Sequence, residues 1–477
     1  MPFYTWLRPH EGDSKRRLQT KKRAADKIRA LRSAFETHLA QQAATANTEP
    51  PKDPTKVLRL ATWNLREFDA PSYGKRSEEA MSYIAEIVSF FDLVAIQEVR
   101  RDLTAVNSLQ HLLGPNWSYI ATDVTEGASG NKERMAFLYN RNRVWFRDVA
   151  GELTLPHGHK VTDPFGERFG VAGGAELNLP PGSILSSPPD VRHTTLASGD
   201  IKLKEDVEIP LPANTRLLLP PNSALRFAKN ARVPLNSQKG IDIPASQNPH
   251  LPDAAEIVLP PGSVVGGPKQ FARTPYIASF QSGWLKLNLA TVHIYYGQGD
   301  AGLERRKEEI RRLTKLLADR AASDSDSDAD AYFIALGDFN IVGKDHETMA
   351  ALITNEFEVP APLQTVPGSN VKRDKFYDQI ALWTGKSNRR KSYTRLRTYR
   401  AGVFDYFDTV FRNDEEAIYH PFMRKPDNPN EFYSSYTTWR TYQMSDHLPM
   451  WIELHIDFAE EYLDEVDAEL QAKLGQP

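Results

Sequence analysis

Five short segments of this chain carry a carboxylate, an amide or an imidazole at or beside the end of an apolar run, and few folds accommodate that pattern. Taken singly, a strand-end Asp or Asn usually caps a turn, and a single strand histidine is usually structural. Open α/β sheets, however, collect ligands and catalytic groups at one end of their strands. The whole set therefore predicts an α/β fold with a functional site at one sheet edge. Its members are Asn64, Glu98, His293, Asp338, Asn340, Asp446 and His447.

The spacing of apolar residues from Val57 onward agrees with this prediction. Two segments, 135–140 and 144–153, are predicted as paired strands because a turn-like stretch separates them. Further strands are predicted for 57–65, 92–99, 284–296, 331–336 and 450–456, and helices for 77–91 and 302–321.

The two ends of the chain differ in charge. Residues 14–46 predict one long helix, and residues 1–50 hold ten basic and five acidic side chains. This helix either packs on the body of the protein with a solvated basic face or serves as an arm that binds nucleic acid or another partner. Residues 457–477 hold seven acids and one lysine, and predict an acidic terminal helix.

Residues 157–274 have a different character. The segments LPPGSIL, LPPNSAL and LPPGSVV begin at Leu179, Leu219 and Leu259, an interval of 40 residues. Proline followed by Gly or Asn predicts a turn, and three such repeats suit a small β-rich module. We expect an insertion with a scaffold or partner-binding role. The predicted domains are residues 1–56 (basic helix and linker), 57–156 with 275–456 (main domain), 157–274 (insertion) and 457–477 (acidic helix).

The composition excludes several classes of function. A net charge of −3 over 477 residues excludes a nucleic-acid binder that relies on charge alone. The absence of cysteine excludes disulfides, zinc–thiolate sites and thiol nucleophiles. No run reaches the roughly 18 apolar residues of a membrane-spanning helix, and the first residues lack the apolar core of a signal peptide. We therefore expect a soluble, cytoplasmic protein without a membrane partner.

The strand-end residues have the composition of a metal-assisted hydrolytic site. Carboxylate and amide oxygens select Mg²⁺, Mn²⁺ or Ca²⁺ over zinc. Hydrolysis of a phosphodiester needs such a cation at the phosphoryl oxygen, an oriented water, and proton transfer on both sides of phosphorus. Imidazoles such as those of His293 and His447 suit the proton transfers, because an ordinary pKa of about 6.5 lets them take and give protons near neutral pH.

The segments TWNL, IQEV, VHIYY, GDFN and SDHLP occur in an order that resembles the endonuclease/exonuclease/phosphatase superfamily, over about Val57–Pro156 and Pro275–Ile456. This resemblance implies an α/β, four-layered sandwich of two packed mixed β-sheets flanked by helices, here with the β-rich insertion and the terminal helices added. The segments Asn131–Val144 and Lys375–Leu382 resemble the deoxyribonuclease I-like branch.

The resemblance to that branch also implies roles for individual residues. One carboxylate would orient each imidazole, Glu133 that of His293 and Asp378 that of His447, with one imidazole as general base and the other as general acid. The implied catalytic residues are His293, His447, Asp338, Glu133 and Asp378; the implied metal ligands are Glu98, Asn64, Asp446 and Asp338; and the implied phosphate-binding residues are Asn340 and Asn64.

Two features bear on a nucleic-acid substrate. Arg100 matches an arginine that such enzymes direct at the DNA minor groove. The segment Lys386–Arg400 holds seven basic residues and no acid, so it is either a solvated hairpin or a strip that follows a nucleic-acid backbone. The candidate contacts within it are Arg389, Arg390, Lys391, Tyr393 and Arg395.

The favoured function is a nuclease that depends on Mg²⁺ or Mn²⁺, with Ca²⁺ as a further option and with DNA favoured over RNA. One alternative is a phosphomonoesterase or lipid phosphodiesterase of the same superfamily. Another is a non-catalytic nucleic-acid-binding protein. The sequence leaves open whether a protein partner binds at the insertion or at the N-terminal helix.

Overall fold

The structure is a computed structural model, and the described chain divides into two compact units. One unit comprises Met1–Leu153 with Ala272–Pro477, and the other comprises Thr154–Phe271. The described residues are 1–45, 51–68, 70–124, 133–154, 271–323, 331–385, 396–425, 428 and 430–475, together with short strands between residues 160 and 266.

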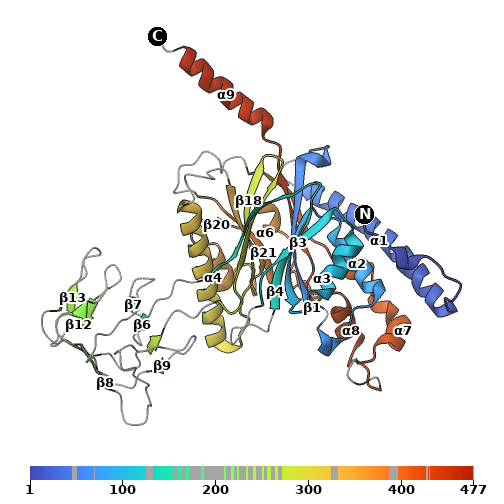
Figure 1. Ribbon diagram of the computed structural model, residues 1–477, viewed down its shortest axis with the longest axis horizontal. Helices are drawn as coiled ribbons and strands as arrows, with labels where there is room; N and C mark the ends of the chain where they lie inside the picture. The colour runs from blue at the N-terminus through green and yellow to red at the C-terminus, as the bar shows by residue number, and fades with distance from the viewer. Residues whose placement is uncertain are drawn as a thin grey trace. The chain divides into compact units, whose positions relative to one another are not determined.

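The larger unit is built on two six-stranded mixed sheets (Figure 1). The strand order of the first sheet is β22-β23-β1-β2-β4-β3, in which β1 and β2 run parallel and the other neighbours antiparallel. Its strands are β1 (Val57–Phe68), β2 (Leu93–Arg100), β3 (Trp117–Ala121), β4 (Glu133–Asn140), β22 (Thr398–Val403) and β23 (Met450–His455).

The second sheet repeats this arrangement. Its strand order is β20-β21-β19-β18-β17-β5, in which β18 and β19 run parallel and the other neighbours antiparallel. Its strands are β5 (Trp145–Glu152), β17 (Tyr276–Ser282), β18 (Leu285–His293), β19 (Ala331–Asp338), β20 (Phe357–Glu358) and β21 (Asp378–Trp383).

The two sheets pack against each other, because their central strands are apolar on both faces. All eight residues of β19 are buried, as are most of those of β2. A buried polar contact also joins the sheets: the Gln97 amide nitrogen on β2 donates to Thr62 Oγ1 at 3.1 Å and to Thr291 Oγ1, on β18, at 2.9 Å.

Helices form the two outer layers (Figure 1). The long helix α4 (Gly299–Ser323) packs against β19 and α5 (Glu347–Leu352), whereas α2 (Glu78–Val88) packs against α1 (Lys15–Thr45) and α3 (Thr104–Leu113). The predicted sandwich of two mixed sheets between helices is therefore confirmed. The remaining α-helices in the described part of the chain are α6 (Ala361–Gln364), α7 (Glu416–Tyr419), α8 (Tyr436–Gln443) and α9 (Ala459–Leu474).

The N-terminal helix α1 packs on the body through the apolar positions that define its period. These side chains are all buried: Ala24, Ile28, Leu31, Phe35 and Leu39. A ring contact of 4.4 Å between Phe35 and Phe90 joins the helix to the residues that follow α2. Of the two roles considered for this helix, the structure shows packing on the body of the protein.

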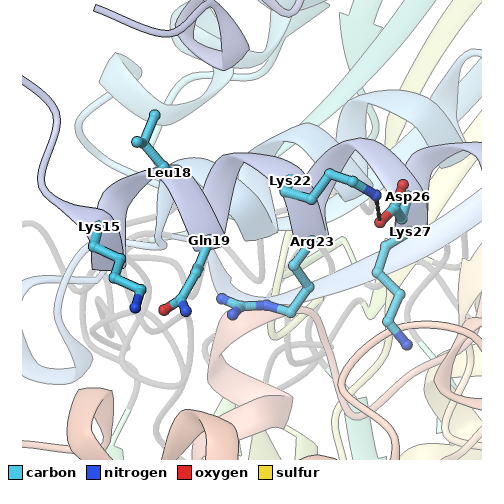
Figure 2. Close-up of a pocket in the computed structure, with 7 residues that line it drawn as sticks. All are labelled: Lys15, Leu18, Gln19, Lys22, Arg23, Asp26 and Lys27. Atoms are coloured by element: carbon cyan, nitrogen blue, oxygen red, sulfur yellow. Dashed lines mark hydrogen bonds and ion pairs between the residues drawn. The ribbon is translucent and has the colours of Figure 1, made fainter. Parts of the chain in front are cut away.

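A polar row on α1 is also partly tied to the body. Figure 2 shows Lys15, Gln19, Arg23 and Lys27 pointing to the same side of the helix. Arg23 Nη2 lies 2.7 Å from a Glu79 carboxylate oxygen, and Lys27 Nζ lies 2.5 Å from a carboxylate oxygen of Glu415.

The prediction that 135–140 and 144–153 pair with each other is wrong. Strand β4 pairs with β2 and β3 in the first sheet, whereas β5 pairs with β17 in the second. The turn between them carries the chain from one sheet to the other. Phe137 of β4 then contacts Phe280 of β17 across the core, with ring centroids 5.4 Å apart.

The smaller unit contains short strands in four sheets. A three-stranded sheet has the order β15-β10-β8, a four-stranded one has β7-β6-β16-β9, and β11-β14 and β12-β13 form pairs. The strands are β6 (Lys160–Thr162), β7 (Arg168–Gly170), β8 (Ile184–Ser186), β9 (Ile209–Pro210), β10 (Arg216–Leu219), β11 (Ser223–Ala224), β12 (Arg232–Pro234), β13 (Gly240–Asp242), β14 (His250–Leu251), β15 (Ala255–Val258) and β16 (Val264–Gly266). Among the described residues, no helix is long and apolar enough to cross a membrane.

Candidate active site

The site lies where the parallel strand pairs of both sheets end. In the second sheet His293 pairs in register with Asp338, and Asp338 pairs with Asp378. Residues paired across neighbouring strands project from the same face of a sheet. Strand register therefore places one imidazole and two carboxylates in a row.

The first sheet supplies Asn64 and Glu98 from the parallel pair β1 and β2. The pairing of β2 with β4 shifts between Ile96 and Val99, and Glu98 in this bulge has φ +60°. The Glu67 backbone N–H donates to Glu98 Oε2 at 2.6 Å and so fixes the turned-out carboxylate. A bulge at a strand end commonly re-aims a side chain toward a site.

Asn64 connects the carboxylates of the two sheets. Its Nδ2 donates to Glu98 Oε1 at 2.9 Å and to Asp338 Oδ2 at 3.1 Å. Its Oδ1 is buried and has no hydrogen-bond partner among the described residues. A buried acceptor without a partner is costly, so this oxygen is a candidate ligand for a cation or for substrate.

The segment Gly337–Asn340 shows why the GDFN sequence is needed. Gly337 has φ +140°, and a Cβ there would lie 2.2 Å from the Val292 carbonyl oxygen, so this glycine lets β18 and β19 approach closely. Asn340 has φ +53°, and its backbone N–H donates to Asp338 Oδ1 at 2.9 Å. Its side chain donates to the Ile294 carbonyl at 2.8 Å, so Asn340 also anchors the residue after His293.

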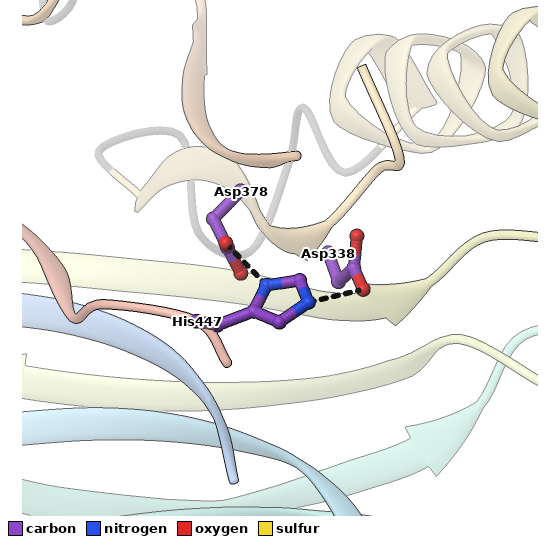
Figure 3. Close-up of side chains that lie close together, drawn as sticks. All are labelled: Asp338, Asp378 and His447. Atoms are coloured by element: carbon purple, nitrogen blue, oxygen red, sulfur yellow. Dashed lines mark hydrogen bonds and ion pairs between the residues drawn. The ribbon is translucent and has the colours of Figure 1, made fainter. Parts of the chain in front are cut away.

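Each histidine is held by its own carboxylate. His293 Nδ1 lies 2.9 Å from Glu133 Oε2, and His447 Nδ1 lies 2.7 Å from Asp378 Oδ2. The two Nε2 atoms lie 3.6 Å and 3.8 Å from the same oxygen, Asp338 Oδ2. Figure 3 shows His447 between Asp378 and Asp338. This arrangement directs the Nε2 atoms of two imidazoles at one point.

The charges around the site raise the pKa of both imidazoles. Burial and the Arg273 charge lower the pKa of His293, but the Glu133 and Asp338 carboxylates outweigh them, so this pKa is raised above its ordinary value of 6.5. Burial likewise lowers the pKa of His447, yet Asp378 and Asp338 raise it well above 6.5.

Arg273 is a member of the site that the sequence did not predict. Its Nε donates to Glu133 Oε2 at 2.9 Å and its Nη2 donates to Oε1 at 3.4 Å, while the residue is 9% exposed. Together with His293, it holds the pKa of the buried Glu133 carboxyl well below its ordinary value, against the effect of burial. Arg273 lies within residues 157–274, which were assigned to the insertion, so its position in the sequence gave no reason to connect it with Glu133.

Two sets of atoms could hold a metal ion. Asp338, Asp378 and His447 offer ligand atoms that lie within 4.8 Å of one another. His447, however, already bonds Asp378 through Nδ1, which favours proton transfer over metal binding by this imidazole. The alternative set is the Glu98 and Asp338 carboxylates, which the Asn64 amide nitrogen bridges, with the partnerless Oδ1 of Asn64 as a further oxygen. Hard oxygen ligands of this kind fit Mg²⁺, Mn²⁺ or Ca²⁺.

The other candidates lie at the rim or outside the described residues. The Asp446 side chain is 43% exposed and lies 3.4 Å from Arg66 Nε. Arg100 forms a 2.9 Å ion pair with Glu67. The candidate nucleic-acid contacts of the basic strip lie outside the described residues; they are Arg389, Arg390, Lys391, Tyr393 and Arg395.

Part of the chain is similar in sequence to curated proteins. Deoxyribonuclease-1 of Canis lupus familiaris is 38% identical over 93 residues, which cover 18% of this chain and 32% of that protein. The chain thus spans about a third of the length of the curated relatives it matches.

Solved structures are also similar to this chain. An endonuclease/exonuclease/phosphatase from Bacteroides vulgatus is 11% identical, with 84% of this chain and 99% of that one covered and a TM-score of 0.38. A mannosyl-6-phosphatase from Bacteroides thetaiotaomicron is 14% identical, with 83% and 99% covered and a TM-score of 0.37.

A family model settles the assignment. The model described as the Endonuclease/Exonuclease/phosphatase family matches residues 61–390, more than two thirds of the chain. The matched stretch includes Asn64, Glu98, His293 and Asp338. This chain therefore belongs to the endonuclease/exonuclease/phosphatase family.

Proposed function

We propose that this protein is a divalent-metal-dependent phosphodiesterase that hydrolyses DNA. Its family comprises hydrolases of phosphoester bonds, and part of the chain is similar to deoxyribonuclease-1. The observation that carries the proposal is the pair of oriented imidazoles, His293 and His447, whose Nε2 atoms both lie within 3.8 Å of Asp338 Oδ2. Hydrolysis of a phosphodiester needs a proton removed from the attacking water on one side of phosphorus and a proton supplied to the leaving oxygen on the other. Two imidazoles suit these two tasks.

The residues would act as follows. The Nε2 atom of one histidine removes a proton from the attacking water as the new oxygen–phosphorus bond forms. The other imidazole, protonated at Nε2, gives its proton to the leaving oxygen as the bond between that oxygen and phosphorus breaks. Glu133 and Asp378 keep both rings oriented through Nδ1 and stabilise the imidazolium form of each.

The oxygen ligands fit a divalent cation. Asn64, Glu98 and Asp338 would hold it, and the partnerless Oδ1 of Asn64 would gain a ligand bond. When bound, such a cation supplies positive charge at a phosphoryl oxygen. Asp338 and Asn340 would position the phosphate and the attacking water, while Asp446 at the rim would assist the metal or the base.

The test is a substrate panel with purified protein. Supercoiled plasmid, single-stranded DNA, RNA and a soluble phosphomonoester are incubated with Mg²⁺, Mn²⁺, Ca²⁺ or EDTA. We expect cleavage of DNA with Mg²⁺ or Mn²⁺ and none with EDTA. Release of phosphate from the monoester alone would overturn the proposal and favour a phosphomonoesterase.

A further inference from the structure

An exposed aromatic side chain lies close to His293 in the sequence. Tyr296 follows His293, the last residue of β18, by three residues. It is 51% exposed, whereas nearly all residues of that strand are buried. A large ring left open to solvent offers a surface on which a planar group can stack.

This ring is held in place from beneath. The Arg306 guanidinium lies 4.7 Å from the centre of the Tyr296 ring and donates to the Tyr296 carbonyl. Arg306 also donates to the Asn340 carbonyl at 2.8 Å and is only 5% exposed. One face of the ring is thus covered by a fixed cation, and a pre-ordered ring loses little conformational entropy when it binds.

A second tyrosine leads from Tyr296 to the catalytic pair. The rings of Tyr296 and Tyr377 lie 6.5 Å apart and nearly perpendicular, and the Tyr377 ring lies 5.5 Å from that of His447. Tyr377 immediately precedes Asp378, the carboxylate that holds His447. The two tyrosines therefore form an aromatic step that ends at the reacting groups.

Basic residues lie near Tyr377 in the sequence. The loop 370–377 contains Lys372, Arg373 and Lys375 against one acid, Asp374. The loop is tied to the site, because the Val371 backbone N–H donates to the Asp446 carbonyl at 3.1 Å. Aromatic rings beside basic residues are the pattern by which proteins bind single-stranded nucleic acid.

We propose that Tyr296 and Tyr377 bind the unpaired base next to the scissile phosphate, so that single-stranded nucleic acid is the preferred substrate class. This inference rests on the proposed phosphodiesterase function. In a continuous duplex both faces of each base are stacked on neighbouring bases, so no face is free for Tyr296. Every base has an aromatic face, so little dependence on base identity is expected.

Binding without turnover tests the inference. Metal-free protein is titrated with a short single-stranded oligonucleotide that carries a fluorescent adenine analogue quenched by stacking, and with its duplex. We expect the wild-type protein to quench the fluorescence of the single strand. Tyr296→Ala should bind the single strand about 5- to 100-fold more weakly. Tyr296→Trp should recover the wild-type affinity, because tryptophan also offers an aromatic face. Trp284→Ala is the matched control, because Trp284 is also 51% exposed but precedes the first residue of β18, at the opposite end from His293.

The outcomes separate the two proposals. Unchanged binding by Tyr296→Ala, or equal quenching by duplex and single strand, overturns the aromatic step even if DNA is cleaved with Mg²⁺. If the wild-type protein cleaves no nucleic acid and hydrolyses only a phosphomonoester, the proposed function fails and this inference fails with it. Loss of binding in Trp284→Ala would also overturn it, because the effect would not be specific to the rim.

Discussion

At the scale of single residues, Asp338 organises the site. It pairs in register with both His293 and Asp378, and its Oδ2 accepts from Asn64. The same oxygen lies within 3.8 Å of the Nε2 atoms of both histidines. The burial of Asp338 raises the pKa of its carboxyl, but His447 and His293 lower it more, so it stays ionised at neutral pH.

The two histidines should be strongly non-additive. His293→Ala and His447→Ala should each lower the rate of DNA cleavage by about 10²–10⁴-fold. The double mutant should be little slower than the slower single mutant, since either loss already forfeits the coupled proton transfers. Rates of cleavage are measured alongside thermal midpoints, which separate lost chemistry from lost folding. Near-native activity of His293→Ala would rule out the deoxyribonuclease-like mechanism.

Glu309 should make stability depend on pH. This α4 carboxyl is 6% exposed, and burial raises its pKa from the ordinary 4.5 to about 7, although the Ala272 N–H and the charges of Arg305 and Arg273 oppose the shift. Between these values the folded chain keeps a proton that the unfolded chain has lost. The contribution of Glu309 to the free energy of unfolding should therefore fall by roughly 3 kcal/mol as pH rises through this window.

Glu309→Gln should remove that dependence, because glutamine does not titrate. Urea unfolding at about pH 5 and about pH 8 should show a smaller change in the free energy of unfolding for Glu309→Gln than for the wild type. Glu11→Gln, at an exposed position, is the control and should behave as the wild type does. An equal change in all three proteins would contradict the assignment.

At the scale of elements, the approach of β18 to β19 depends on Gly337. Gly337→Ala should destabilise the fold by about 2–4 kcal/mol, because the new Cβ would overlap the Val292 carbonyl and force the strands apart. Activity per folded molecule should fall too, since His293 and Asp338 form the next register pair. Gly343→Ala is the control, because its Cβ would meet no atom closer than 3.9 Å. It should change neither the free energy of unfolding nor the activity per folded molecule. Urea unfolding and cleavage rates measure both effects.

The docking of α1 depends on a buried ion pair. Arg23 donates to both oxygens of Glu79, which also accepts from Tyr83 and Tyr419. Arg23→Ala should cost about 3 kcal/mol, because it leaves the Glu79 charge buried with two hydroxyl donors only. Lys22→Ala removes an exposed pair with Asp26 (Figure 2) and should cost less than about 0.5 kcal/mol in the same unfolding measurement.

At the scale of the whole molecule, the smaller unit should be dispensable for chemistry. Every described member of the candidate site belongs to the larger unit, and Ala272 and Arg273 lie just outside the smaller one. Replacing Gly173–Gly267 by a short linker should leave a folded domain that still cleaves simple substrates. Circular dichroism and cleavage rates check this, and an unfolded product would show that the insertion belongs to the core.

The sequence alone was enough to predict the family, the sandwich of two mixed sheets and the strand-end residues of the site. These features depend on spacing along the chain: apolar runs predict strands, and Asp338 and His293 stand where such runs end.

Contacts between distant segments required the folded chain. Arg273 and Glu133 are 140 positions apart, and only packing brings them to 2.9 Å. Strand β5 joined a sheet different from that of its neighbour β4 because partner choice depends on the whole core, not on the turn between the two strands. The aromatic step at Tyr296 and the raised pKa of Glu309 arise in the same way. Burial and neighbouring charges set such properties, and both are defined only once the chain has folded.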